Sequence, residues 1–402
     1  MSKIHFLPVK NGDSFVIECD KGNQHGLVVV DGGPTGYGKV LQSKVEATGT
    51  PDLLVLTHYD DDHIGGLTQY IDARLAEGVL PAKEVWANCA GYVEVDDVMT
   101  RSITQGVKLS ELLNRLARTG EMAWRDDIEE GIDKDYPFAS IEVVSPTAEV
   151  RGMVIEKQVE AGLKKRMSAK KMEEVEIDDL TIPLEELAKS TPKAPNLKKS
   201  NELANAASIA FILRCDGLSI LMLGDGYPHN VEAFLRNKGY SEDNPLEVDY
   251  VKVAHHGSVN NTSNELLDII KCNHFIIPTN GYKHHHPDRT AIAHILCHPK
   301  RDRDEKVHLY FNCSMDELVG QKGKPFVNDG EEETWNFEIH ECATELFMQV
   351  PEPETQPEQE PEPAPQARVT PAPAKRSWKS YIIWIAIALA LAIAVLAFCL
   401  GR

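Results

Sequence analysis

The chain has 402 residues, of which 42% are hydrophobic, enough for one large or two ordinary domains with a sizeable core. Its formal net charge of -20 argues against a protein that binds nucleic acid through a simple basic surface. The eight cysteines are scattered without a CxxC pair, and the start MSKIHFLPVK lacks the apolar core of a secretory signal. We therefore expect reduced thiols in a cytosolic compartment.

The N-terminal part of the chain predicts short strands that end in polar motifs. Residues 4–19 (IHFLPVKNGDSFVIEC) predict two strands with Asn11-Gly12-Asp13 as the turn. An apolar strand over 26–31 ends in Asp31-Gly32-Gly33, and another over 53–56 leads directly into THYDDDHIGG, residues 57–66. A helix over 64–76 and a strand over 85–88 follow.

The middle of the chain is rich in charge and mostly helical in pattern, over 99–123 and 155–187. We predict a solvated helical insertion over about 99–195 within a domain that spans 1–347. Its basic run, Lys164 to Lys171, is more typical of a charged helix face than of a contact with an acidic substrate.

The following segment alternates apolar strands with polar strand ends. Cys215-Asp216-Gly217 between two apolar runs predicts a hairpin whose second strand ends in Gly224-Asp225-Gly226. A strand over 247–254 leads into His255-His256-Gly257-Ser258, and one over 275–278 precedes NGYKHHHPD. Final strands are predicted over 307–311 and 335–340, which makes the fold a mixed α/β fold.

The C-terminal tail has a different composition. Residues 348–374 are rich in Pro and Glu and predict a disordered linker. Residues 381–400 form a charge-free apolar stretch of the length that spans a bilayer, within a juxtamembrane and membrane segment over 375–402. Because three basic residues precede the span and only Arg402 follows it, we expect a single-pass protein of the cytoplasmic membrane whose large domain is cytoplasmic.

Metal-capable side chains follow the predicted strands at Asp31, His58, Asp225 and His255. Strand ends at one edge of two packed sheets can converge on one point. In THYDDDHIGG, four imidazole and carboxylate groups fall within six residues: His58, Asp60, Asp62 and His63. Such groups cannot all be buried unless positive charge neutralises them, and a divalent metal is the simplest source of that charge.

These motifs resemble the metallo-β-lactamase superfamily, whose signature is H-x-[HD]-x-D-H after a strand, then a bridging Asp and a final His. NGDSF, VDGGP, THYDDDHIGG, FILRCDGLSILMLGD, VKVAHHGS and HPD look like the nuclease domain of ComEC-type competence proteins, over roughly 4–312. The resemblance stops before the tail, because those proteins carry a multi-span channel. It implies a four-layer αβ/βα sandwich with two metal ions at one sheet edge.

By this resemblance His58 and Asp60 bind one metal, Asp62 and His63 bind the other, and Asp225 bridges them. Either His255 or His256 completes the second site; His255 is preferred because it directly ends the strand. No histidine lies between His63 and His229, so the first site is short of ligands and is completed by water or by Asn205. Zinc is the first choice, and the carboxylate-rich set also suits manganese.

Further residues receive roles near the metals. Asp31 either orients a ligand or caps the glycine turn, two readings of equal weight. Asp62 is also assigned to catalysis, and His286 is predicted to contact the substrate or to protonate the leaving group. Asn205 and Ser208 are expected to line the same pocket, although either could merely cap a strand end.

Three functions fit this site. The first is a phosphodiesterase or nuclease that uses a water activated by two metals, with nucleic acid as the substrate. The second is hydrolysis of a small ester, lactone, thioester or phosphocholine-like group by the same chemistry. The third is a metal-binding module in a membrane-tethered defence or signalling assembly, whose protein partners the sequence does not name.

Overall fold

The computed structural model describes residues 1–88, 101–163 and 179–347, all within the compact unit Met1–Val350. The predicted linker, the predicted membrane span and the basic run that begins at Lys164 lie outside the described residues. Within the described ranges, no helix combines the length and the apolar character that crossing a membrane requires.

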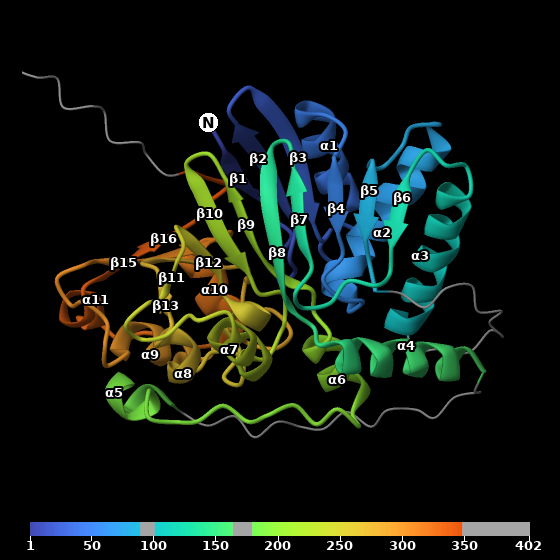
Figure 1. The fold of residues 1–402 in the computed structure, drawn as a ribbon. Coiled ribbons are helices and arrows are strands. Elements are labelled where there is room, and N and C mark those ends of the chain that lie inside the picture. Colours follow the sequence, from blue (N-terminus) through green and yellow to red (C-terminus); the bar gives the residue numbers. More distant parts are fainter. Residues whose placement is uncertain (89–100, 164–178, 348–402) are drawn as a thin grey trace, which may run out of the picture. The chain divides into compact units, whose positions relative to one another are not determined.

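Two β-sheets dominate the described part of the chain (Figure 1). The described strands of the first sheet are, in spatial order, β17 (Glu345–Leu346), β1 (Lys3–Phe6), β2 (Phe15–Lys21), β3 (Gln24–Val30), β4 (Leu53–Val55), β5 (Glu84–Trp86) and β6 (Ala123–Arg125). Those of the second sheet are β16 (Phe337–His340), β15 (Val307–Phe311), β14 (His274–Ile277), β12 (Tyr250–Lys252), β10 (Leu218–Met222), β9 (Ala210–Cys215), β8 (Ala139–Ser145) and β7 (Asp133–Tyr136). A small separate pair consists of β11 (Leu246–Glu247) and β13 (Ile270–Lys271).

Helices cover the outer face of each sheet. Those whose side chains join the core of the first sheet are α1 (Gly38–Thr48), α2 (Asp61–Ala76), α3 (Arg101–Ala117), α4 (Ala148–Leu163) and α6 (Ser200–Ala206). Those that join the core of the second sheet are α5 (Leu184–Leu187), α7 (Pro228–Asn237), α8 (Asn264–Leu267), α9 (Arg289–Cys297), α10 (Met315–Lys322) and α11 (Glu331–Trp335). Two short 3-10 helices are η1 (Asp179–Thr181) and η2 (Ala254–Gly257).

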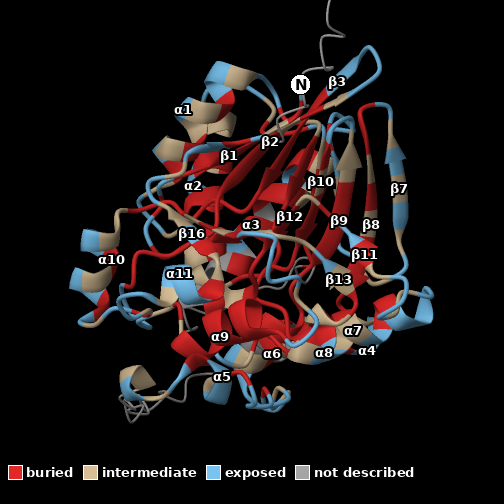
Figure 2. Cartoon of the chain, turned by 90° about the vertical axis from the view of Figure 1, so that its left-hand side faces the viewer, coloured by how far each residue is buried: buried red, intermediate tan, exposed pale blue. Residues whose placement is uncertain are grey.

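Three apolar cores hold these layers together. The middle core joins the two sheets, with Phe15 from β2 and Trp86 from β5 packed in the same cluster as Phe211 from β9 and Ile220 from β10. One outer core lies between each sheet and its helices. The central strands, such as β4, β10 and β12, are therefore largely buried (Figure 2), which is why their sequences are nearly continuous apolar runs. The described residues thus form the predicted helix–sheet–sheet–helix order.

The topology directs polar loops to one end of each sheet. In the first sheet β3 and β4 run parallel, and in the second sheet β10, β12 and β14 run parallel. The carboxyl ends of parallel strands lie at the same edge. The polar motifs predicted after these strands are therefore brought into two groups, one at each sheet.

The predicted helical insertion requires a correction. Residues 123–145, inside the predicted range of 99–195, contribute strands β6, β7 and β8 to the edges of the two sheets. β6 pairs with β5, and β8 pairs with β9. Strand β7 (DKDY) alternates only between exposed and half-buried positions, so it lacks the apolar pattern that would have revealed it. The helices α3 and α4 do form in this region, as predicted.

Candidate metal centre

His58, His63 and Asp225 meet between the two sheets. His58 follows β4, His63 lies in the first turn of α2, and Asp225 follows β10. The Nε2 atom of His63 lies 3.4 Å from Oδ1 of Asp225, and Nε2 of His58 lies 3.8 Å from Oδ2 of Asp225. Both Nε2 atoms and Asp225 Oδ1 are buried without a hydrogen-bond partner among the described residues. Leaving several such atoms unpaired is costly, so this donor set fits a bound cation.

His255 and His256 approach the same carboxylate from the second sheet. Their Nε2 atoms lie 3.6 Å and 3.9 Å from Oδ2 of Asp225. His256 Nε2 also lies 3.6 Å from Oδ2 of Asp62, while Oδ2 of Asp60 lies 3.9 Å from His58 Nε2. The structure therefore brings all seven predicted ligand residues together, and it does so for both histidines between which the sequence left a choice.

The backbone around this pair explains how both rings can face Asp225. His255 and His256 have positive φ angles of 49° and 56°, and Gly257 continues with 83°. The amide of His255 donates to the carbonyl of Gly224 at 3.0 Å, which ties this turn to the loop that carries Asp225. A left-handed conformation is costly for residues other than glycine and persists where the surroundings enforce it, often at functional sites.

The opposite ring nitrogen of each histidine is engaged outside the centre. Nδ1 of His63 lies 2.8 Å from Oδ2 of Asp31, and Nδ1 of His256 lies 2.6 Å from the carbonyl oxygen of Pro278. These acceptors hold the proton on Nδ1 and leave the Nε2 lone pair toward Asp225, as in carboxylate–histidine–metal arrangements. Asp31 thus orients the ring of a candidate ligand, which favours one of its two predicted roles.

Glycines allow Asp31 to reach His63. Helix α2 begins at Asp61, three residues before its predicted start, and its first turn rests directly on the loop after β3. A Cβ atom on Gly66 would lie 1.9 Å from the carbonyl oxygen of Gly32, and one on Gly32 would lie 2.1 Å from the backbone nitrogen of Leu67. Gly32 and Gly66 are therefore needed for this backbone-to-backbone contact.

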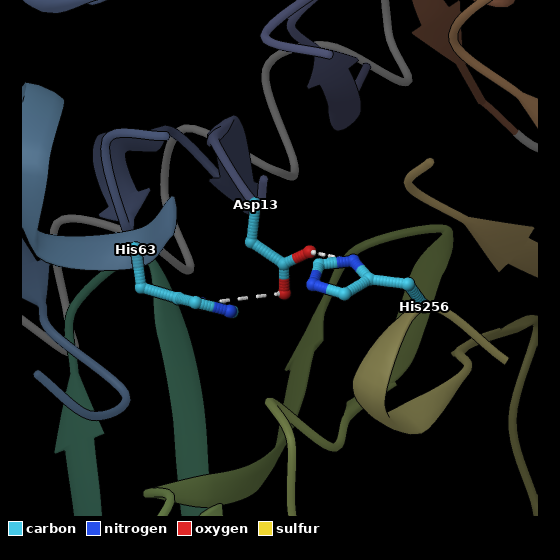
Figure 3. Close-up of side chains that lie close together, drawn as sticks. All are labelled: Asp13, His63 and His256. Carbon is cyan, nitrogen blue, oxygen red and sulfur yellow. Dashed lines mark ion pairs between the residues drawn. The ribbon is translucent and has the colours of Figure 1, made fainter. Parts of the chain in front are cut away.

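Asp13 and Lys252 belong to the centre, although sequence reasoning gave neither a role there. Figure 3 shows Asp13 between His63 and His256; its Oδ2 lies 3.8 Å from Nδ1 of His63 and its Oδ1 lies 3.5 Å from Nδ1 of His256. The fully buried Lys252 forms an ion pair with Asp13, donates to the Gly224 carbonyl at 2.8 Å, and lies 3.8 Å from Asp225 Oδ1. The sequence feature that could have indicated the role of Lys252 is its position as a lysine within the apolar strand before His255.

The electrostatics of the centre favour binding a cation. Burial, together with the nearby Asp62 and Asp225 carboxylates, raises the pKa of Asp60 to about 7. Burial opposes the charged form of His63, yet the Asp225 and Asp31 carboxylates prevail and raise its pKa well above the ordinary value. Protons thus offset the carboxylate charge in the metal-free protein, and a divalent cation would displace them.

The remaining predicted site residues lie beside the ligands. Ser208 is fully buried; its Oγ lies 3.3 Å from Nδ1 of His58 and accepts from the amide of Asp225 at 3.0 Å. These contacts favour a positioning role for Ser208, and its predicted part in lining the substrate pocket stays a prediction. Asn205 Nδ2 lies 3.4 Å from Nδ1 of His255, so it too contacts a candidate ligand through the ring nitrogen that faces away from Asp225.

His286 borders the centre from the loop after β14. Its ring centroid lies 5.3 Å from that of His255, and its Nδ1 lies 3.4 Å from Oδ2 of Asp288. Asp288 is itself held, because its Oδ2 accepts from the amide of Val259 at 2.8 Å. The ring is therefore positioned next to the ligands, where a group that contacts substrate is needed.

The metallo-beta-lactamase superfamily model matches residues 7–87, the segment that carries Asp13, Asp31, His58 and His63. The match is confined to the N-terminal part of the chain. Together with the convergent His and Asp donors, the match supports a metallohydrolase, and these donors could hold a divalent metal ion. The match does not specify a substrate.

Comparison with solved structures gives distant neighbours. A protein from Parabacteroides distasonis described as a metal-dependent hydrolase is 12% identical, with a TM-score of 0.33, and the alignment covers 85% of this chain and 94% of the other. A HARLDQ-motif mutant of a metallo-beta-lactamase from Cronobacter sakazakii is 12% identical over 59% and 70% of the chains, with a TM-score of 0.26. A metallo-beta-lactamase from Hirschia baltica is 13% identical over 56% and 73%, with a TM-score of 0.23. At these TM-scores the likenesses carry no argument. No curated protein matches the chain.

Proposed function

We propose that the protein is a metal-dependent phosphodiesterase that cleaves nucleic acid with two divalent ions, zinc by preference or manganese. The observation that carries this proposal is the position of Asp225, whose carboxylate lies 3.4–3.9 Å from the Nε2 atoms of four histidines on both sheets. A carboxylate in such a position can bridge two ions. The resemblance to ComEC-type nuclease motifs supports the choice of substrate class.

Because both His255 and His256 face Asp225, the pair supplies the ligand that the predicted first site was short of. His256 lies beside Asp62, and with His63 these residues form one ligand set. His58 and Asp60 form the other set with His255, because Nε2 of His255 lies 3.6 Å from Oδ2 of Asp225, the same oxygen that Nε2 of His58 approaches at 3.8 Å. The first site is then completed by His255 rather than by water or by Asn205, which contacts the Nδ1 atom of His255 instead.

In this mechanism, bound divalent ions would activate a water and stabilise the charge that develops on a phosphoryl oxygen. The protein residues hold and orient the groups around them. Asp31 fixes the ring of His63, and the Pro278 carbonyl fixes the ring of His256. His286, oriented by Asp288, protonates the leaving oxygen. Lys283 lies on the same loop as His286, and its charge favours the ionised form of the Asp60 carboxylate. The same charge adds positive potential for a phosphate.

The test is hydrolysis by the full chain, supplied with zinc or manganese, of single-stranded DNA and of a small ester or phosphocholine ester. Asp225→Asn should abolish DNA cleavage, and the exposed Asp243→Asn is the matched control that should retain it. His286→Gln should lower kcat more than it changes KM. Ester hydrolysis without DNA cleavage would move the function to small molecules. Metal binding without hydrolysis would favour the role of a module in an assembly.

We further propose that the domain acts at the cytoplasmic face of a membrane. This proposal rests on residues 381–400 and on the basic residues that precede them, all outside the described part of the chain. Removal of 375–402 should release the protein into the soluble fraction of cells without loss of hydrolysis. Membrane association that survives this truncation would contradict the proposal.

A further inference from the structure

A second group of metal-capable side chains lies on β15 and β16, which carry no residue of the metal centre. His308 of β15 pairs with Glu338 of the edge strand β16, and the next residue on the same face of β16 is His340. The ligand atoms of these three residues all lie within 4.8 Å of one another. The side chains of His308 and Glu338 are 25% and 48% exposed, so solvent ions can reach them.

The two imidazoles face each other through their nitrogens. Nδ1 of His308 lies 2.9 Å from Nε2 of His340, and Oε2 of Glu338 lies 4.0 Å from the same Nδ1. Two nitrogens bound to one tetrahedral zinc at about 2.0–2.1 Å lie about 3.3 Å apart, so the rings need to separate by only about 0.4 Å. Glu338 also pairs with Lys306 at 3.3 Å, a surface contact weak enough for the carboxylate to turn away from it.

Aromatic neighbours hold both rings in this orientation. The ring of His308 stacks on that of His274, with centroids 4.7 Å apart and planes 8° from parallel. The ring of His340 stacks on that of Tyr310 at 4.5 Å and 12°. Because the rings are fixed before any ion binds, little conformational entropy is lost on binding.

We propose that His308, Glu338 and His340 form an accessory zinc site, separate from the hydrolytic centre. A donor set of two imidazoles and one carboxylate matches zinc and leaves a coordination position for water. The ion would take the place of the hydrogen bond between the two rings, the proton of that bond would move to the outer nitrogen of its own ring, and the ion would link edge strand β16 to β15. Such a clip protects an edge that is otherwise paired on one side only.

The test counts zinc bound to the full chain, purified in detergent, by equilibrium dialysis and elemental analysis. Wild type should bind one zinc ion more than His340→Gln or His308→Gln, and hydrolytic activity should be the same in all three. His25→Gln is the matched control, because His25 is an exposed histidine paired with Asp20 on the first sheet. Two substitutions on different strands separate loss of the site from misfolding of one variant.

The opposite outcome is equally clear. Equal zinc content in wild type, His340→Gln and His308→Gln would show that the rings share only a hydrogen bond, and the proposal would fail. Loss of the extra ion from His25→Gln as well would show non-specific surface binding and would also overturn it. Neither result bears on the Asp225 centre, so failure here is distinguishable from failure of the hydrolase proposal.

Discussion

Replacement of Asp31 by Asn tests whether the carboxylate behind His63 prepares this histidine to bind metal. Asp31 is fully buried, and its Oδ2 lies 2.8 Å from Nδ1 of His63 and accepts from Oγ1 of Thr57 at 2.7 Å. Its Oδ1 accepts from the amide of Thr57 at 2.8 Å. Asparagine tolerates the positive φ of 57° at this position, so the turn itself should survive.

In Asp31→Asn, the side-chain oxygen can still accept from the backbone N–H of Thr57. The side-chain nitrogen then faces Nδ1 of His63 and cannot accept its hydrogen bond. The Nδ1 proton of His63 then loses its acceptor, and the tautomer with the proton on Nε2, which cannot bind metal, becomes competitive. Loss of such an outer hydrogen bond lowers metal affinity by about 10–100-fold, which corresponds to about 1.4–2.8 kcal/mol.

The assay is zinc affinity measured by competition with a chromogenic chelator. Asp61→Asn is the matched control, because Asp61 lies in the same helix turn as His63 but accepts from Thr35 Oγ1 at 2.7 Å. We expect the control to keep wild-type affinity. Unchanged affinity in Asp31→Asn would refute the reasoning and would return Asp31 to the role of a cap on the glycine turn.

Two further changes test the stability of the domain by chemical denaturation. Lys252→Met removes the buried ammonium that pairs with the Asp13 carboxylate and should cost about 3–5 kcal/mol. Asp13→Asn in the same chain should recover much of this, and no recovery would show that the two residues do not act as a pair. Burial lowers the pKa of His294, which is fully buried, to about 4. Since the unfolded chain binds the additional proton between about pH 6.5 and pH 4, the free energy of unfolding should fall as the pH falls through this window, by up to about 1.4 kcal/mol per pH unit. His294→Gln should flatten this slope, and an unchanged slope would contradict the assignment.

The sequence predicted the centre because its ligands follow strands that the apolar pattern reveals. His58 and Asp225 come directly after β4 and β10, and parallel topology then brings strand ends together. Asp13 could not be assigned this way, since it lies in a loop between antiparallel strands and its role depends on the approach of the second sheet. Lys252 lies in a strand, and its position in the sequence does not show that its side chain pairs with a buried carboxylate from the other sheet.

Other features depend on tertiary contacts that local patterns do not contain. Strands β6 and β7 sit at sheet edges, where few positions are buried, so their sequences carry little strand pattern. The direction of the His255 and His256 rings follows from the left-handed backbone after β12, a conformation that is uncommon for any residue other than glycine and that the motif alone does not predict. A choice of one histidine was therefore natural from the sequence, whereas the structure turns both toward Asp225.

The most direct test of the central claim is the anomalous X-ray scattering of crystals grown with zinc or manganese, recorded at the absorption edge of the ion. We predict two peaks bridged by the Asp225 carboxylate, one beside Nε2 of His58 and the other beside Nε2 of His63, and neither in crystals of Asp225→Asn. Absence of anomalous density between these side chains in the wild-type protein would contradict the assignment of a metal centre.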